Sequence, residues 1–380
     1  MAQEVIAAGQ AEAAGQAEAV GQAEAVGQRD SGQSGQARLG ALDVCRGLAI
    51  LAVLFIHVSG HFLPGLHPAH SLKPPTWAWY TLAVPNQDAQ WAVPCFLMLS
   101  AFVNALSLSR GNDVGRYLKR RVQTALVPYL LWSAVYIAVN VLVKHQHMPG
   151  IRSTLTLLQN GTAYFHLYFF VLVLEMYVLL PLFVPLFRRR PPFWAVAAGA
   201  VILQALVYGL NRYVFLHRFQ TTILWDILPV ALGLWLFGQS ARWPQIFRRG
   251  VWGAGAVTLA ALAVYTPLAV ATMLPHAHIN TALYQFGQWG YTAGMSFLML
   301  ALAGALGRGR LTALLGYLGA ESLAIYVLHP LAILALDRMG LNKALGTGPG
   351  LVVYYATCLA LPLAAAWAWK RGKRVAAGRA

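Results

Sequence analysis

The chain has 380 residues, of which 58% are apolar and only 11% are charged. A soluble domain carries about 25% charged residues, so this composition excludes a large soluble core and indicates that lipid surrounds much of the chain. The net charge of +16 does not indicate nucleic-acid binding, because the Lys and Arg residues lie in short clusters between apolar runs. Cys45, Cys95 and Cys358 show neither metal-ligand spacing nor a disulfide pattern.

The N-terminal segment 1–38 differs in composition from the rest of the chain. It is rich in Ala, Gly and Gln, and the unit Gly-Gln-Ala-Glu-Ala recurs every six residues. Such a segment buries too little apolar surface to offset the entropy lost on ordering. We therefore expect a disordered cytoplasmic tail at 1–38, a membrane domain at 39–370 and a basic cytoplasmic tail at 371–380.

The remaining sequence is dominated by apolar runs, which we assign to transmembrane helices. In chain order these runs are 42–63, 91–108, 124–143, 166–187, 193–210, 223–238, 251–273, 289–306, 314–336 and 351–369. The prediction is an all-α polytopic membrane protein, a bundle of about ten transmembrane helices.

The basic residues between these runs predict the orientation of the chain. If the N-terminus lies in the cytoplasm, 21 of the 28 Lys and Arg residues fall on the cytoplasmic side and 7 on the outer side. Cytoplasmic loops of membrane proteins carry such an excess. We therefore expect both termini in the cytoplasm.

Ionisable residues on the first run share one helix face. Arg46 and His57 are eleven residues apart, which places them within about 20° of each other and about 16 Å apart along the axis. His61 lies one turn beyond His57. An imidazole exchanges a proton near neutral pH, so His57 suits a general base. Its alternative role is a hydrogen bond between helices, and that of Arg46 is snorkelling to the membrane interface. A metal or haem at His57 and His61 is disfavoured, because no Glu accompanies them as in HExxH.

Two later runs also carry ionisable groups at membrane depth. Glu175 lies near mid-bilayer, where it would either polarise a histidine or form a hydrogen bond between helices. Ser322 and His329 share a face of the ninth run, with Glu321 beside it. That stripe is either functional or a polar seam between helices.

Several motifs together resemble acyltransferase family 3, the integral-membrane enzymes that acylate bacterial surface glycans and lipids. The first helix of the family carries an Arg, ten intervening residues and a His, as Arg46 and His57 do. The other similar segments, in order, are 93–102, 117–121 with 127–132, 166–169 with Tyr177 and Pro181, and 322–330. The chain has Ser100-Ala101 where the family usually has Ser-Gly, which affects helix packing and not the reacting groups.

The resemblance implies transfer of an acyl group, usually acetyl, from cytoplasmic acyl-CoA to a hydroxyl or amine of an extracytoplasmic glycan or lipid-linked sugar. It implies a multi-pass protein of the cell inner membrane, with acetyl-CoA or another acyl-CoA as donor substrate and no permanently bound cofactor or metal. Membrane lipid is the other expected partner, nucleic acid is not expected, and the sequence leaves open whether the protein forms a homo-oligomer.

The resemblance also suggests roles for individual residues. We expect Arg46 and His57 to be catalytic with support from Glu175, and His61, His166 and His329 to contact the acceptor. Arg116, Lys119, Arg120 and Arg121 could hold the coenzyme A phosphates, although they could equally serve membrane topology alone. A polar passage along the Arg46–His57 face would bring donor and acceptor together. The rival function is a transporter or exporter of a glycan or small polar substrate, although we find no repeat of two halves.

Overall fold

The computed structural model describes residues 40–68, 71, 73–111, 113–214, 222–275 and 277–377. Every regular element within these ranges is helical, which agrees with the expected all-α class. The tail predicted at 1–38 lies outside the described residues. The basic segment expected as a tail from 371 is helical as far as Ala377.

Within the described ranges, seven helices are long and apolar enough to cross a membrane. They are the helix Gly40–Leu66, Trp77–Arg110 (α2 Trp77–Asp88, η1 Ala89–Trp91 and α3 Ala92–Gly111), Val114–Leu142 (α4 Val114–Arg121, the π-helical turn η2 Val122–Leu126 and α5 Val127–Leu142), α7 Tyr168–Arg188, α8 Phe193–Tyr213, Ser240–Thr272 (η4 Ser240–Arg242 and α10 Trp243–Thr272), and Thr347–Gly372 within α15 Thr347–Ala377.

The other helices are shorter, bent or less apolar. They are α6 Ile151–Asn160, η3 Ile223–Asp226, α9 Ile227–Gly238, α11 Thr281–Ala305, α12 Arg310–Ala320, α13 Ser322–Arg338 and α14 Leu341–Ala344. The run 314–336, expected as one helix, is divided between α12 and α13, which meet at an angle of 73°. This pair counts as an eighth span only if its two halves cross together.

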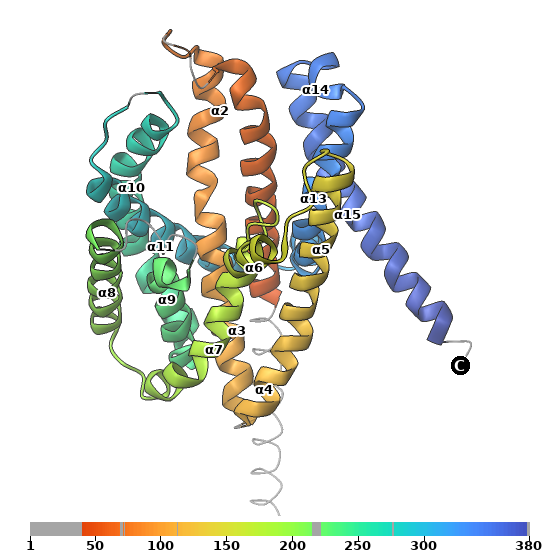
Figure 1. Cartoon of the computed structure of the whole chain (residues 1–380). Helices are drawn as coiled ribbons and strands as arrows, with labels where there is room; N and C mark the ends of the chain where they lie inside the picture. The colour runs from red at the N-terminus through yellow and green to blue at the C-terminus, as the bar shows by residue number, and fades with distance from the viewer. Residues whose placement is uncertain are drawn as a thin grey trace, which may run out of the picture.

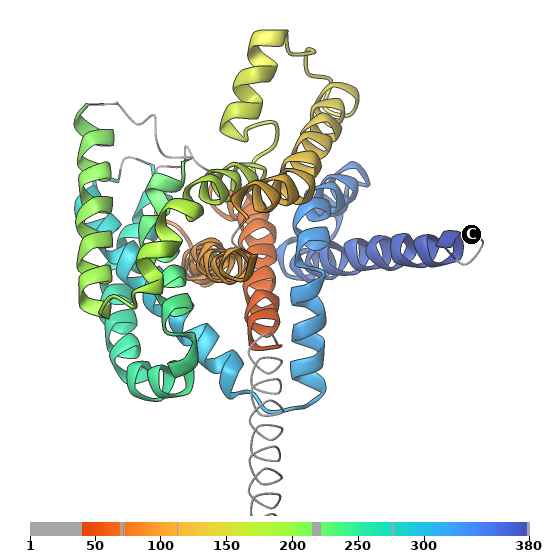
Figure 2. The same ribbon diagram turned by 90° about the horizontal axis from the view of Figure 1, so that it is seen from below.

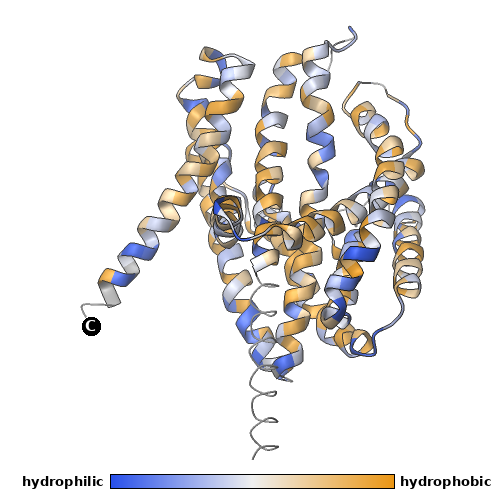
Figure 3. Ribbon diagram, turned by 180° about the vertical axis from the view of Figure 1, so that it is seen from behind, coloured by the Kyte–Doolittle hydropathy of each residue, from blue (hydrophilic) through white to orange (hydrophobic). Residues whose placement is uncertain are grey.

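The long helices stand side by side around helix Gly40–Leu66 and α3 (Figure 1). The helices α8 to α11 lie on one side, and α5, α13 and α15 lie on the other, as the view from below also shows (Figure 2). Apolar residues predominate along the helices, whereas hydrophilic residues gather toward several helix ends (Figure 3). The C-terminal end of α15 projects away from the bundle.

Two glycines let α12 cross helix Gly40–Leu66 with backbones in contact. A Cβ atom on Gly319 would collide with the carbonyl oxygen of Asp43, and one on Gly47 would collide with that of Leu315. Small residues at a helix crossing permit such an approach inside a membrane. This crossing fixes the end of the helix that carries Arg46.

Candidate functional site

Three imidazoles from separate parts of the chain meet inside the bundle. His57 belongs to helix Gly40–Leu66, His166 lies in the turn before α7, and His329 is on α13. The ring centroid of His329 lies 5.1 Å from that of His57 and 5.7 Å from that of His166. His166 and His329 are buried and His57 is partly buried. The structure thus brings together one residue expected to be catalytic and two expected to bind substrate.

The turn before α7 is folded inward by the end of α6. Gly161 ends this helix in the left-handed region, at φ 67°, and a Cβ there would collide with the backbone of Tyr168. A left-handed residue packed this closely must be glycine. The chain can therefore reverse after α6 and carry His166 into the bundle.

Aromatic side chains enclose the three imidazoles. The ring of Phe165 lies 4.8 Å from His57, and the rings of Tyr136 and Tyr326 lie 4.9 and 5.2 Å from His166. The Tyr326 hydroxyl donates to the backbone carbonyl of His166, and the Tyr136 hydroxyl donates to that of Val327 at 2.6 Å. These tyrosines position the histidines. Tyr326 lies in the family-like segment 322–330, whereas no motif or pattern in the sequence distinguishes Tyr136 from the other aromatic residues.

The hydrogen bonds of the cluster leave imidazole nitrogens available. The Nδ1 atom of His329 lies 3.1 Å from the carbonyl oxygen of Ile325, and a carbonyl only accepts, so Nδ1 carries the proton. This tautomer leaves a lone pair on Nε2 of His329, which has no hydrogen-bond partner among the described residues. Both ring nitrogens of His166 also lack one there. The cluster therefore offers proton acceptors in an apolar surrounding.

His61 lies apart from this cluster, in contact with α13 and α15. Its Nε2 is 3.0 Å from Oδ1 of Asp337, which also accepts from the Tyr354 hydroxyl at 2.7 Å. The rings of His61 and Tyr354 are stacked, with centroids 5.4 Å apart. The structure therefore places His61 in a bridge between helices rather than beside the other imidazoles.

A second cluster, of arginines and tyrosines, surrounds the other end of helix Gly40–Leu66. Arg46 pairs with Asp43 at 2.7 Å. The guanidinium of Arg121 lies 5.1 Å from the ring of Tyr117 and 5.2 Å from that of Tyr177. Tyr177 also lies within electrostatic range of Arg46. Tyr177 is thus in contact with the Arg121 guanidinium and is influenced electrostatically by Arg46 from another helix.

Arg121 is the last residue of α4 and directly precedes the π-helical turn η2 within the long helix Val114–Leu142. Pro128 has no backbone N–H to bond to the carbonyl of Thr124, so the helix widens over Val122–Leu126. The Nε of Arg121 is buried, whereas Arg116, Lys119 and Arg120 are exposed on α4. Of the four residues expected to hold coenzyme A phosphates, only Arg121 turns inward.

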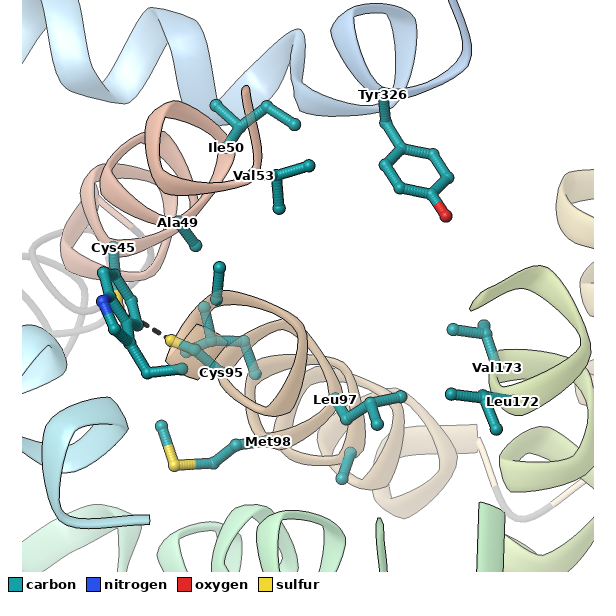
Figure 4. Packing of buried hydrophobic residues seen from close by; sticks show 14 of the residues in the cluster. Cys45, Ala49, Ile50, Val53, Cys95, Leu97, Met98, Leu172, Val173 and Tyr326 are labelled. Carbon is teal, nitrogen blue, oxygen red and sulfur yellow. Dashed lines mark hydrogen bonds between the residues drawn. The ribbon is translucent and has the colours of Figure 1, made fainter. Parts of the chain in front are cut away.

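Apolar residues separate the two clusters. Ile50 and Val53 lie on the Arg46–His57 face, and they are 0% and 1% exposed. Figure 4 shows both among the packed side chains between helix Gly40–Leu66 and the helix that carries Tyr326. The expected polar passage is therefore interrupted along this face by closely packed side chains.

Glu175 points to a different part of the bundle. Its Oε2 accepts a hydrogen bond from the backbone N–H of Ile223 at 2.6 Å. This bond ties α7 to η3 and matches the helix-to-helix alternative for Glu175. The structure does not bring its carboxylate to the imidazoles, and any catalytic role of Glu175 stays a prediction.

Comparison with known proteins identifies the family of the chain. No curated protein and no solved structure matches it significantly. A family model described as "Acyltransferase domain" matches residues 39–368, which include both clusters and nearly all of the described helices. The chain therefore belongs to acyltransferase family 3 and is a multi-pass membrane acyltransferase.

Proposed function

We propose that the protein transfers an acetyl group from cytoplasmic acetyl-CoA to a hydroxyl or amine of an extracytoplasmic glycan or lipid-linked sugar, in the cell inner membrane. The observation that supports this most is the meeting of His57, His166 and His329, two of which, His166 and His329, have ring nitrogens without a hydrogen-bond partner among the described residues. An acyl acceptor must lose a proton when it attacks a thioester, and a neutral imidazole can take it.

In this proposal His57 accepts the proton as the acceptor oxygen or nitrogen bonds to the thioester carbonyl carbon. The carbon–sulfur bond then breaks and the coenzyme A thiolate leaves, to be protonated by the imidazolium. In the alternative route a His57 ring nitrogen attacks the thioester carbonyl and the coenzyme A thiolate leaves. The acceptor then attacks the acetyl group, the bond to the imidazole breaks, and the acceptor proton passes to the thiolate. Stacking on His329 holds the His57 ring in place for either route.

The arginine and tyrosine cluster suits the charged part of the donor. Arg46 and Arg121 would bind phosphate oxygens, and Arg116, Lys119 and Arg120 would attract the nucleotide from the surface of α4. The pantetheine arm of coenzyme A is uncharged. It could replace the packing around Ile50 and Val53 without bringing charge into that apolar segment.

The same proposal includes ten crossings with both termini in the cytoplasm. Adding the bent α12–α13 pair, the apolar helix Ile223–Gly238 and the 25-residue α11 to the seven long spans gives ten. The distribution of Lys and Arg supports this topology. Reporter fusions after residues 72, 113 and 377 should read outside, inside and inside.

The test of the function is acetyl transfer in membranes supplied with labelled acetyl-CoA. Wild-type membranes should label a surface glycan, and the His57→Ala variant should lose at least a hundredfold in rate. Near-normal transfer by a correctly inserted His57→Ala protein would remove His57 from the mechanism. Movement of a labelled glycan across the membrane without consumption of acetyl-CoA would instead favour the exporter.

A further inference from the structure

A separate polar pocket of about 180 Å³ lies between α3, α8, α9 and α11, bordered by the first residue of α7. Figure 2 shows α8 and α9 on the opposite side of the central helices from α13. Among the residues that line it are Gln90, Tyr168, Trp225, Asp226, Gln288 and Trp289. No imidazole of the cluster described above lines this pocket, so it is a different site.

Asp226 is the only charged residue that the described part of the chain contributes to the lining of this pocket. It stands at the N-cap of α9, but its side chain does not cap that helix. Its carboxylate makes no hydrogen bond or ion pair within the described part of the chain. Asp226 is partly buried, and a carboxylate that loses water contacts without gaining a partner is destabilising. No contact within the described part of the chain therefore explains why an acidic residue stands here.

Gln204 holds the backbone on both sides of Asp226. Its Nε2 donates to the carbonyl of Trp225 at 2.9 Å, and its Oε1 accepts from the backbone N–H of Leu228 at 2.8 Å. The side chain of Gln204 is 2% exposed. Both the donor and the acceptor of the Gln204 amide therefore hold the backbone turn at Trp225–Leu228 in place, and this turn orients Asp226 before any ligand binds.

The polar and aromatic side chains that line the pocket can attract positive charge. An ionised Asp226 carboxylate attracts a cation, the amide oxygens of Gln90 and Gln288 can accept hydrogen bonds, and aromatic rings favour a cation over their faces. Among the described residues, no Lys, Arg or His lines the pocket, although the chain as a whole is strongly basic. The pocket volume of about 180 Å³ is larger than a bare metal ion needs, so a small organic cation fits it better.

We propose that this pocket binds the protonated primary amine of a small ligand, with Asp226 as its counter-ion. An ammonium group has three N–H donors, which the carboxylate and the two glutamine oxygens can accept. An amino sugar and an ethanolamine lipid headgroup both carry this group. The inference goes beyond the acyl-transfer proposal and does not rest on it, because it concerns binding at a site that excludes the three histidines.

Thermal unfolding of the purified full-length protein in detergent tests the inference. Glucosamine hydrochloride and ethanolamine hydrochloride are the probes, with glucose and sodium chloride at equal concentration as controls. A ligand that binds the folded state raises the unfolding midpoint as its concentration rises. At least one amine should do so, whereas glucose and sodium chloride should not. The amine that acts at the lower concentration identifies whether a sugar or a headgroup is the source.

Variants separate the proposed site from binding elsewhere. Asp226→Asn keeps the shape of the side chain and should weaken the apparent affinity for the amine about tenfold or more. Gln90→Leu removes one acceptor and should also weaken it. Asp113→Asn is the matched control, because Asp113 is exposed and caps α4, a role that Asn fills equally well.

Three results would overturn the proposal. The first is stabilisation by glucose equal to that by the amines. The second is no stabilisation of the wild-type protein by either amine. The third is an undiminished amine effect in Asp226→Asn.

Discussion

The imidazole rings of His57 and His329 are stacked, with centroids 5.1 Å apart and planes inclined by 20°. They come from helix Gly40–Leu66 and α13, so the contact joins two helices at the centre of the proposed site. The fixed tautomer of His329 leaves its Nε2 lone pair free. His329 can therefore do more than support the ring of His57, since it can also accept a hydrogen bond from the substrate.

Replacing His329 by Phe separates these two roles. The phenyl ring keeps an aromatic face against His57 but has no Nε2, so the rate of acetyl transfer should fall about a hundredfold. The measurement is initial rate in membranes at matched protein abundance. Full activity of His329→Phe would mean that the residue serves packing alone.

Arg121 and Arg120 provide a paired test of donor binding. Arg121 stacks on Tyr117 and Tyr177, whereas Arg120 is exposed. Lysine keeps the charge but lacks the planar guanidinium, which stacks on aromatic rings and binds a phosphate through two hydrogen bonds. Arg121→Lys should therefore raise the KM for acetyl-CoA about tenfold with little change in kcat, and Arg120→Lys should change it less than twofold. Equal effects of the two substitutions would argue that only the charge of α4 matters.

Hydropathy predicted where helices lie better than how they bend. The first run was expected at 42–63, and the helix spans Gly40–Leu66, because a long apolar run in lipid can only bury its backbone polar groups as a helix. The 73° angle between α12 and α13 was missed. Nothing in the local sequence around Glu321 forbids a straight helix, and the bend accompanies a close crossing at Gly319 with a distant segment.

Sequence analysis selected the three histidines that meet inside the bundle, but it did not predict that they meet; their roles in the reaction stay predictions. His57, His166 and His329 were selected one by one, either as ionisable groups in apolar runs or through the family motifs. The three histidines meet because the chain reverses direction at Gly161, directly after α6. This reversal lies between the predicted runs 124–143 and 166–187, where the sequence analysis places no helix. The position of the Glu175 carboxylate could not be predicted for a similar reason. Its hydrogen-bond partner is the backbone N–H of Ile223, and a pattern of side chains does not reveal a backbone donor.

Substitution of Glu175 distinguishes its two expected roles. Gln retains an oxygen that can accept from the N–H of Ile223, so Glu175→Gln should keep both stability and the rate of acetyl transfer. Glu175→Leu leaves that N–H without a partner, which should lower the free energy of unfolding by about 1–3 kcal/mol. Thermal unfolding and transfer assays on the same preparations check both values. A loss of activity in a stable Glu175→Gln protein would show that the carboxylate takes part in the reaction.

The crossing of α12 over helix Gly40–Leu66 depends on the absence of a side chain at Gly319. An alanine there would force its Cβ against the carbonyl of Asp43, a backbone atom that cannot rotate away. Overpacking of this kind costs about 1–3 kcal/mol, and the displaced Asp43 would also disturb its ion pair with Arg46. Gly319→Ala should therefore lower the unfolding midpoint and raise the KM for acetyl-CoA together.

Gly316 lies on the same helix and has room for a Cβ, which would be 4.0 Å from the nearest atom, on Val44. Gly316→Ala should leave KM unchanged and raise stability slightly, because alanine favours a helix more than glycine does. If Gly319→Ala and Gly316→Ala behaved alike, the close crossing would not be what positions Arg46.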